Sequence, residues 1–448
     1  MVNYGGLHAA VAALINAALV AYLALFPGAF ALAVRRLRLA FGRRALMSVP
    51  LVWVATELGR TTIFGGFPWV LLGYSQVSVS PIAQLASVCG VYGVSALVAA
   101  VGAALAAIAL ERRDAGTPGA FPRSAPARWP YLWAAAVLTG LVGTAVWGTA
   151  RIAGGELTRQ GDPVRVGLIQ GNVDQAEKWD ETRAAAIFNG YLDMTRQAIA
   201  GRAELVLWPE SSTPFLFEEE RARSDQVRRL ARENHVPILL GSDQIERGAA
   251  TRYYNAAFLV RADGATAGVY RKMHLVPFGE YVPLKRALFF AAPIVEAVSD
   301  FSPGESAVLL PIEGHRLSTA ICYEIVYPDL VRQFVRGGSE LLTSITNDAW
   351  FGRTSAPYQH FAQASMRAIE EGRYLVRSAN TGISGIVDPY GRVVTQSRIF
   401  EPAVIVGVAR FLRASTFYAR HGDVLAYASA VTALGLLLAA WLTARVRR

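Results

Sequence analysis

Charged residues and cysteines are both scarce in this chain. Asp, Glu, Lys and Arg make up 17% of its 448 residues and hydrophobic residues 53%, whereas about a quarter of a typical soluble domain is charged. This composition excludes an ordinary soluble protein and indicates membrane-spanning segments beside a globular part. The two cysteines, Cys89 and Cys322, cannot staple the globular part, because Cys89 lies in an apolar run. Cys322 is therefore a candidate reactive thiol.

Several common catalytic signatures are also missing. The chain has no Gly-x-Ser-x-Gly nucleophile elbow, no His-Glu-x-x-His zinc motif and no glycine-rich phosphate loop. These absences argue against a serine hydrolase, a zinc peptidase or a nucleotide-binding enzyme of those types. We expect neither a metal nor another cofactor.

Five segments are apolar enough and long enough to cross a bilayer, which takes roughly 20 residues. They are residues 7–34, 45–64, 82–110, 130–150 and 423–444. Because the first segment contains a proline at position 27, we expect it to be kinked or to end near that residue.

Arginines gather on one side of these segments. They lie between the first and second segments, between the third and fourth, and after the last: Arg35, Arg36, Arg38, Arg43 and Arg44; Arg112, Arg113, Arg123 and Arg128; Arg445, Arg447 and Arg448. The positive-inside rule makes these regions cytoplasmic and places residues 151–422 on the outer side. The net charge of +10 is then mainly a topology signal rather than a basic face, and no nucleic-acid partner is expected.

Short apolar strands alternate with amphipathic helices from about residue 163 to about residue 409. Strands are expected at 164–170, 204–208, 237–241, 255–260, 265–270, 317–322, 340–346 and 374–378, and helices at 182–200, 218–234, 328–336 and 358–371. This alternation predicts an α/β domain with helices packed on sheets. We therefore expect a transmembrane helical bundle of about four spans in residues 1–150, an outer α/β catalytic domain in 151–415 and a C-terminal transmembrane helix in 416–448.

Three polar clusters follow apolar strands, at the strand ends where side chains project into a cleft. They contain Glu210, Lys272 and Cys322. A carboxylate can take the proton of a thiol, the thiolate can attack a carbonyl, and an ammonium can stabilise the oxyanion that results. The three groups together are therefore suited to thiol acyl transfer. Lys272 could also lower the pKa of the thiol.

Each of these residues also has a plainer interpretation. Cys322 is compatible with a small buried hydrophobic residue, Glu210 with a helix N-cap or a surface carboxylate, and Lys272 with ordinary surface charge. His274 is an alternative base, although its apolar neighbours are more typical of a packed histidine. Only the combination is specific.

That combination resembles the nitrilase superfamily, whose members use a Glu-Lys-Cys triad. The matching motifs are Trp208-Pro209-Glu210, Arg271-Lys272-x-His274-Leu275 and Ile321-Cys322-Tyr323-Glu324, with a later run at residues 377–385. The resemblance implies an α-β-β-α sandwich with each triad member at the end of a strand. It also implies that Glu280 positions Lys272 and the tetrahedral intermediate, and that Glu324 and Tyr323 support the site.

Among the branches of this superfamily, the chain resembles the apolipoprotein N-acyltransferases over nearly its whole length. The motifs that carry this likeness include Gly66-Phe67-Pro68-Trp69, Gln170-Gly171-Asn172, Lys178-Trp179 and the runs at 275–283 and 347–352. The family usually has more spans than the five counted here, and we expect the additional ones to precede this sequence.

This branch implies a multi-pass enzyme of the bacterial inner membrane with a periplasmic catalytic domain. Its members transfer a fatty acyl chain from a membrane phospholipid to the N-terminal amine of a diacylglyceryl-cysteine lipoprotein. The resemblance implies that Cys322 carries the acyl group as a thioester and that Trp179, Tyr323 and Trp350 line the acyl site. We expect a monomer.

Residues 284–298 suggest a lid. Their apolar side chains, among them Phe289 and Phe290, favour a segment that dips towards lipid, and a buried core helix is the alternative. Two other functions stay open: a membrane-tethered amidase of nitrilase type with water as acceptor, and a polytopic membrane protein without catalytic activity. Four spans ahead of the domain exceed what tethering needs, and the spans hold few polar residues for a transport pathway, so the acyltransferase is favoured.

Overall fold

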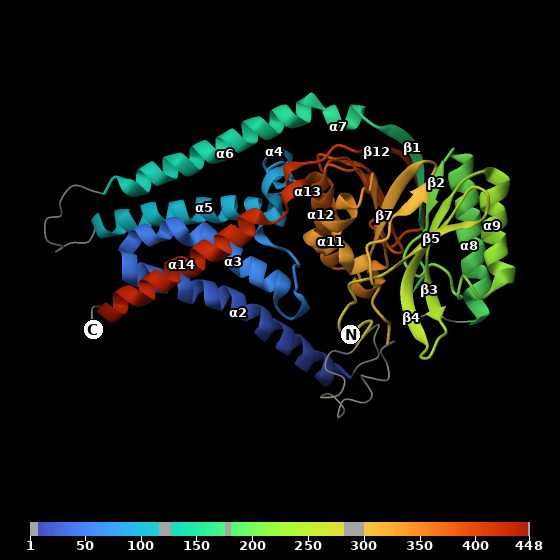
Figure 1. Cartoon of the computed structure of the whole chain (residues 1–448), viewed down its shortest axis with the longest axis horizontal. Helices are drawn as coiled ribbons and strands as arrows, with labels where there is room; N and C mark the ends of the chain where they lie inside the picture. Colours follow the sequence, from blue (N-terminus) through green and yellow to red (C-terminus); the bar gives the residue numbers. More distant parts are fainter. Residues whose placement is uncertain (1–7, 116–126, 175–180, 282–299, 447–448) are drawn as a thin grey trace. The chain divides into compact units, whose positions relative to one another are not determined.

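The computed structural model describes residues 8–115, 127–174, 181–281 and 300–446. The chain divides into two compact units (Figure 1). One unit is helical and consists of Ala13–Gly155 with Thr416–Arg448, and the other contains Glu156–Ser415. The predicted lid at 284–298, with Phe289 and Phe290, lies outside the described residues, as does Trp179.

The helical unit contains long apolar helices. They are α2 (Ala9–Phe41), α3 (Val49–Thr62), α5 (Ala86–Ala115), α6 (Trp129–Gly154) and α14 (Val424–Val446). Within the described residues, four helical segments are long and apolar enough to cross a membrane: Ala9–Gly65, Ala86–Arg113, Trp129–Arg159 and Val424–Arg445.

The first of these segments contains two of the five predicted spans. Its 57 residues would extend about 85 Å as one helix, far more than the roughly 30 Å of a bilayer core. Instead the chain turns at the 3₁₀ helix η1 (Gly42–Ser48), which joins α2 to α3 (Figure 1). The helix does not end at Pro27, because α2 continues through it to Phe41.

Large apolar side chains cover the outside of the helical unit. Leu25, Leu132 and Val431, on three different helices, are each more than half exposed. Exposed apolar surface on this scale is typical of contact with lipid or another protein. Between the helices, the small residues Ala433 and Ala440 of α14 belong to one buried cluster with Leu37 of α2 and Val52 of α3, and small residues of this kind let membrane helices approach closely.

The second unit contains two six-stranded sheets, in the orders β12-β1-β2-β3-β4-β5 and β11-β10-β9-β8-β7-β6. The strands are β1 (Asp162–Gln170), β2 (Leu205–Leu207), β3 (Ile238–Glu246), β4 (Arg252–Val260), β5 (Thr266–Arg271), β6 (Leu310–Ile312), β7 (His315–Ile321), β8 (Leu341–Thr346), β9 (Leu375–Ala379), β10 (Gly385–Val387), β11 (Val393–Gln396) and β12 (Ala403–Phe411).

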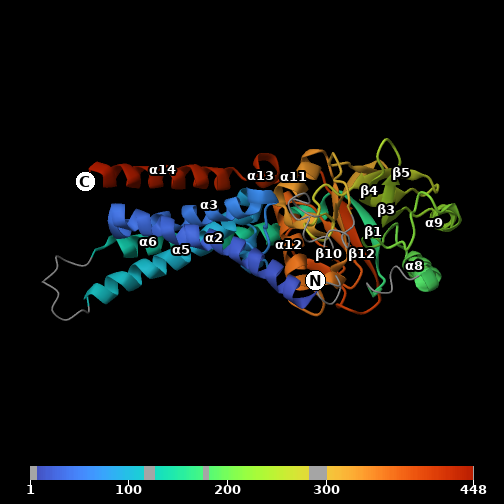
Figure 2. The ribbon, with the colours of Figure 1, turned by 90° about the horizontal axis from the view of Figure 1, so that it is seen from below.

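Helices cover the outer faces of both sheets (Figures 1 and 2). The first sheet carries α8 (Glu181–Ala200) and α9 (Arg221–Asn234), and the second carries α11 (Pro328–Arg336) and α12 (Ala356–Glu371). The two sheets face each other, and the Ser378 hydroxyl on β9 donates to the Ile169 carbonyl on β1 at 2.8 Å. The predicted α-β-β-α sandwich beside a helical membrane part is confirmed.

Strand direction brings the ends of several strands to one edge. In the first sheet β1, β2 and β3 are parallel, and β5 runs the same way because it is separated from β3 by the antiparallel β4. In the second sheet β7, β8 and β9 are parallel. Residues that directly follow β2, β5, β7 and β8 therefore emerge at the carboxyl edges of the two sheets, where ligands bind in α/β folds.

Neither β6 nor β12 was expected from the sequence, whereas the turn Asp388-Pro389-Tyr390-Gly391 predicts the hairpin formed by β10 and β11. β6 is only three residues long and contains Pro311. β12 is a continuous apolar run without the alternation that marks a half-buried strand, yet all nine of its residues pair with β1, from Asp162↔Phe411 to Gln170↔Ala403.

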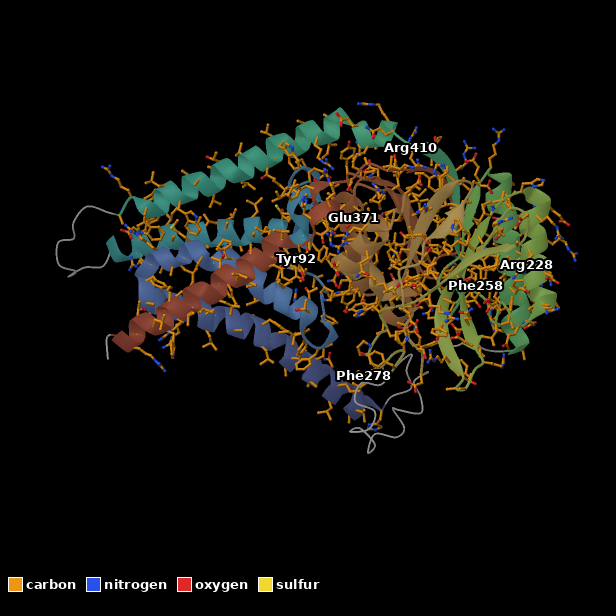
Figure 3. All side chains as sticks on the ribbon, viewed as in Figure 1. Tyr92, Arg228, Phe258, Phe278, Glu371 and Arg410 are labelled. Carbon is orange, nitrogen blue, oxygen red and sulfur yellow. The ribbon has the colours of Figure 1, made fainter. Side chains whose placement is uncertain are left out.

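The layer between the first sheet and its helices is the main apolar core that supports the Glu210 segment. Trp208 is fully buried there, its ring stacked on Tyr191 with 5.1 Å between centroids. Phe258 of β4 packs in the same layer (Figure 3). The indole N–H of Trp208 donates to Thr195 Oγ1 at 2.8 Å, so the one polar atom of this side chain is satisfied.

We predict that Thr195→Val lowers the free energy of unfolding by about 1–3 kcal/mol, because it leaves the buried Trp208 N–H without an acceptor. Thermal unfolding of the detergent-solubilised protein would measure the change. Thr251→Val, at an exposed position, is the matched control and should change stability by less than about 0.5 kcal/mol. Equal unfolding midpoints for the Thr195 variant and the unchanged protein would contradict the prediction.

Candidate active site

Lys272 is the centre of the site. It directly follows β5, and its amine lies 2.8 Å from Glu280 Oε1 and 3.4 Å from Glu210 Oε1. The lysine is only 1% exposed, and both carboxylates are largely buried. A charged amine this deep needs partners of opposite charge, because an unpaired buried charge is very costly.

The balance of charge keeps Lys272 protonated. Burial alone would lower its pKa, but the carboxylates of Glu280 and Glu210 outweigh burial and raise the pKa of Lys272 above its usual value. The amine is therefore a fixed positive charge. It is not ordinary surface charge.

Asn255, in the middle of β4, connects the two carboxylates. Its side-chain amide donates to Glu210 Oε1 at 2.7 Å and to Glu280 Oε1 at 2.8 Å. Backbone N–H groups bind the other oxygens: Asn347 N–H donates to Glu210 Oε2 at 2.9 Å, and Val276 N–H to Glu280 Oε2 at 2.8 Å. All four carboxylate oxygens are thus held in place.

A tight turn returns Glu280 towards Lys272. Glu280 N–H donates to the Val276 carbonyl at 2.9 Å, and Phe278 N–H donates to the Tyr281 carbonyl at 2.7 Å. Phe278 adopts a left-handed φ of 60° in this turn. Such a φ is unfavourable for a bulky residue, so the turn depends on these hydrogen bonds and on the Glu280 contacts with Val276 and Lys272.

Cys322 lies where β7 ends and the short 3₁₀ helix η5 (Cys322–Val326) begins. Its φ is 53°, in the left-handed region. A nucleophile on a strained strand-to-helix turn is held out at the sheet edge, as in hydrolases with a nucleophile elbow. Burial raises the pKa of the Cys322 thiol, the charge of Glu210 raises it further, and Lys272 only partly opposes them. The resting thiol is therefore protonated and needs a base.

Glu324 holds the turn at Cys322 by hydrogen bonds. Its carboxylate accepts the Tyr270 hydroxyl at 2.7 Å, the N–H groups of Met273 and His274 at 2.7 and 3.1 Å, and Ile321 N–H at 2.8 Å. It thereby ties the residues after β5, which carry Lys272, to the end of β7, which carries Cys322. Burial raises the pKa of Glu324 to about 7, although these donors lower it.

His274 is packed between aromatic rings. It lies 3.8 Å from Tyr327 and 6.4 Å from Tyr323, measured between ring centroids. Burial and the neighbouring Lys272 charge lower the pKa of His274 to about 4. An imidazole with so low a pKa is a weak base, which disfavours it as the alternative to Glu210.

The remaining sequence-predicted residues differ in their placement. Tyr323 follows Cys322, and its ring is buried against Tyr327. Trp350 lies in η6 (Asp348–Phe351), after β8, and is 48% exposed, so its contact with an acyl chain stays a prediction. Among the described residues, no group of His, Cys, Asp and Glu is arranged to hold a metal ion.

Sequence reasoning missed Asn255 and Asn347. Asn255 was expected to begin a strand, whereas β4 begins three residues earlier and buries this amide. Asn347 directly follows β8, as Cys322 follows β7, and that shared position was the available signal. Asn380 continues the contacts from the end of β9, donating to Asn347 Oδ1 at 3.0 Å.

Two family models match this chain. The carbon-nitrogen hydrolase model matches residues 165–410, and the model of the apolipoprotein N-acyltransferase N-terminal domain matches residues 1–104. The first covers the two-sheet unit and the second covers α2, α3 and most of α5.

Two curated relatives are similar over almost the whole chain. The apolipoprotein N-acyltransferase of Geobacter metallireducens is 40% identical over 95% of this chain and 80% of its own length. The enzyme of that name from Methylococcus capsulatus is 37% identical over 94% of this chain and 80% of its own length.

Solved structures are similar at lower identity. An amidase from Nesterenkonia sp. AN1 is 22% identical, with a TM-score of 0.43 over 58% of this chain and 96% of that chain. A carbon-nitrogen hydrolase from Helicobacter pylori is 17% identical, with a TM-score of 0.42 over 56% of this chain and 89% of that chain.

We predict that Lys272→Met lowers the free energy of unfolding by about 3–5 kcal/mol, because it leaves two buried carboxylates without a cation. A second change, Glu280→Gln, should restore part of that loss by removing one of the unpaired charges. Thermal unfolding would compare the single and double variants. A Lys272 variant as stable as the unchanged protein would contradict the pairing of a charged Lys272 with the two carboxylates.

We also predict opposite effects of Glu210→Gln on two reactions of Cys322. Removing the negative charge lowers the pKa of the thiol, so alkylation by iodoacetamide at pH 8 should be faster, by about tenfold for each unit the pKa falls. Acylation of Cys322 should be slower, because the base is lost. Glu305→Gln, at an exposed position, is the control for both rates. Slower alkylation in the Glu210 variant would contradict the conclusion that the Glu210 charge raises the pKa of the Cys322 thiol.

Proposed function

The chain belongs to the apolipoprotein N-acyltransferase family, and we propose that Cys322, Lys272 and Glu210 perform its acyl transfer through a thioester. The protein is an acyltransferase of the carbon-nitrogen hydrolase superfamily and a membrane protein. The observation that supports the triad is the buried Lys272 amine, paired with Glu210 and Glu280 and acting electrostatically on the Cys322 thiol.

In the first half-reaction, Glu210 takes the proton of Cys322 as the sulfur attacks an ester carbonyl of a membrane phospholipid. The negative charge that develops on the carbonyl oxygen is stabilised by the Lys272 ammonium and by backbone N–H groups at the nucleophile turn. When the tetrahedral intermediate collapses, the ester C–O bond breaks and Glu210 returns the proton to the departing alkoxide. Lysophospholipid leaves, and the fatty acyl group remains on sulfur.

In the second half-reaction, the N-terminal amine of a diacylglyceryl-cysteine lipoprotein attacks the thioester. Glu210 accepts a proton from the amine, the C–S bond breaks, and the sulfur recovers the proton. The product is a lipoprotein with an N-acylated terminus. Dividing the transfer lets two lipid-anchored substrates use one site in turn.

Glu280 balances the charge of Lys272 while Glu210 is protonated. Once Glu210 is protonated it can no longer balance the charge of Lys272, and an uncompensated buried charge would be strongly destabilising. Glu280 lies closer to the amine, at 2.8 Å against 3.4 Å. Lys272 therefore keeps a carboxylate partner throughout the cycle.

The charge pattern supports a location for the enzyme. Arginines such as Arg36, Arg112 and Arg445 lie near the ends of apolar helices on the side we assign to the cytoplasm. We infer a multi-pass protein of the bacterial inner membrane with its α/β unit in the periplasm, where it meets phospholipid and diacylated lipoprotein. We further infer that it acts as a monomer.

The test is to incubate the full chain in detergent with phospholipid carrying a labelled acyl chain. We expect a hydroxylamine-sensitive label on the unchanged protein that Cys322→Ala abolishes. Cys89→Ala is the matched control, because Cys89 is the chain's other cysteine and lies in α5, and it should keep the label.

Adding a diacylated lipopeptide with a free N-terminus should discharge the label onto the peptide, as seen by mass spectrometry. Label that persists in the Cys322 variant would refute the thioester. Release of free fatty acid without peptide acylation would instead support the membrane-tethered amidase.

A further inference from the structure

Three fully buried side chains that the proposed mechanism does not use lie behind Cys322. They are Asp348 after β8, His360 on α12 and Arg377 on β9. His360 Nε2 lies 3.2 Å from the Cys322 carbonyl oxygen, and His360 Nδ1 lies 3.0 Å from both Asp348 Oδ1 and Arg377 NH2. Arg377 NH2 also donates to Asp348 Oδ2 at 2.9 Å. Two different elements thus hold one imidazole against the backbone of the nucleophile.

The Cys322 carbonyl determines that His360 carries a proton on Nε2. A carbonyl oxygen only accepts hydrogen bonds, so this contact requires Nε2–H. Nδ1 faces both a donor, Arg377, and an acceptor, Asp348 Oδ1, so the assignment comes from the Cys322 contact alone. Burial lowers the pKa of His360, with Arg377 adding to that effect and Asp348 opposing it. The Cys322 contact therefore assigns the Nε2–H form of His360.

The Nε2–H of His360 holds the peptide plane between Cys322 and Tyr323. The bond between Cys322 and Tyr323 is trans, so the Tyr323 N–H points away from the side on which the Cys322 carbonyl oxygen lies. With the carbonyl held inwards by His360, the Tyr323 N–H is directed to the opposite side. The carbonyl that His360 contacts belongs to the residue with the left-handed φ, Cys322.

We propose that His360 is a positioning residue for the acyl-transfer reaction, donating from Nε2 to the Cys322 carbonyl so that the nucleophile turn and the Tyr323 N–H stay oriented towards the incoming acyl carbonyl. Asp348 and Arg377 act through it. Thr346 donates to Asp348 Oδ1 at 2.8 Å and Arg377 donates to Ser344 at 3.2 Å, so β8 and β9 fix both partners of the ring.

The proposal rests on the proposed function in one respect: the reaction at Cys322 must pass through an oxyanion. It does not depend on which acyl donor is used. A small activated ester can therefore test it separately from the phospholipid.

The experiment compares His360→Gln with His360→Asn in the full-length protein. Glutamine places an amide N–H near the position of Nε2, whereas asparagine is too short and reaches only the position of Nδ1. Both variants are polar and smaller than or similar to histidine, so they form a matched pair for burial. Two reactions of Cys322 are measured: acylation by p-nitrophenyl butyrate, which forms an oxyanion, and alkylation by iodoacetamide, which does not.

We expect His360→Asn to slow acylation about 10²-fold, the usual effect of losing one oxyanion donor, while alkylation changes less than about threefold. His360→Gln should recover most of the acylation rate. Equal losses in the two reactions, or a glutamine variant no better than the asparagine variant, would overturn the proposal and leave His360 a packing residue.

Measurements on the unchanged protein separate a failure of the proposed function from a failure of the His360 proposal. Acylation by the nitrophenyl ester without acylation by phospholipid would refute the proposed function, and the Gln–Asn comparison would still decide the role of His360. If the asparagine variant does not fold, the glutamine variant alone decides: an acylation rate within about tenfold of the unchanged protein supports the proposal, and a larger loss with normal alkylation overturns it.

Discussion

A positive charge enclosed by protein imposes the strictest condition on this fold. Lys272 is 1% exposed, so its ammonium has lost its water and must be balanced by carboxylates at fixed distances. Glu210 and Glu280 meet that condition from different segments, and Asn255 keeps the two carboxylates together. The end of β5, the turn that carries Glu280 and the segment after β2 are therefore tied to one point. The acyl transfer that we propose at Cys322 takes place beside this buried group of charges, which apolar packing alone could not accommodate.

Strand direction explains how segments far apart in the sequence reach that point. Glu210, Lys272 and Cys322 follow strands that run the same way within their sheets, and Glu324 joins the strand ends of the two sheets by hydrogen bonds. The helices α8 and α9 contribute from the outer layer, where Trp208 is anchored two residues before Glu210. The strands and helices of the sandwich thus bring the polar residues to one edge, where their own hydrogen bonds and ion pairs hold them.

The sequence was most informative where polar residues follow a short apolar strand. Glu210, Lys272 and Cys322 could be proposed for that reason. The alternation of strands and helices predicted an α/β domain, whereas the two-sheet sandwich was implied by the resemblance to the nitrilase superfamily. Asn255 and His360 could not be proposed, because one lies inside a strand and the other on a helix, and their significance depends on contacts between distant segments. The length of α2 beyond Pro27 and the pairing of β12 with β1 also depend on tertiary packing. Local propensity does not encode either.

The pairing of β12 with β1 has a consequence for how such a protein can arise. Asp162 and Phe411 are partners in that ladder, so the two ends of the α/β unit leave it side by side. A domain whose ends are adjacent can be placed within a loop of another protein without stretching the host, which is why insertion succeeds at such sites. The α/β unit therefore has the geometry of an insertable domain. Such a unit can be inserted between two helices of a membrane protein with no change to its own connectivity.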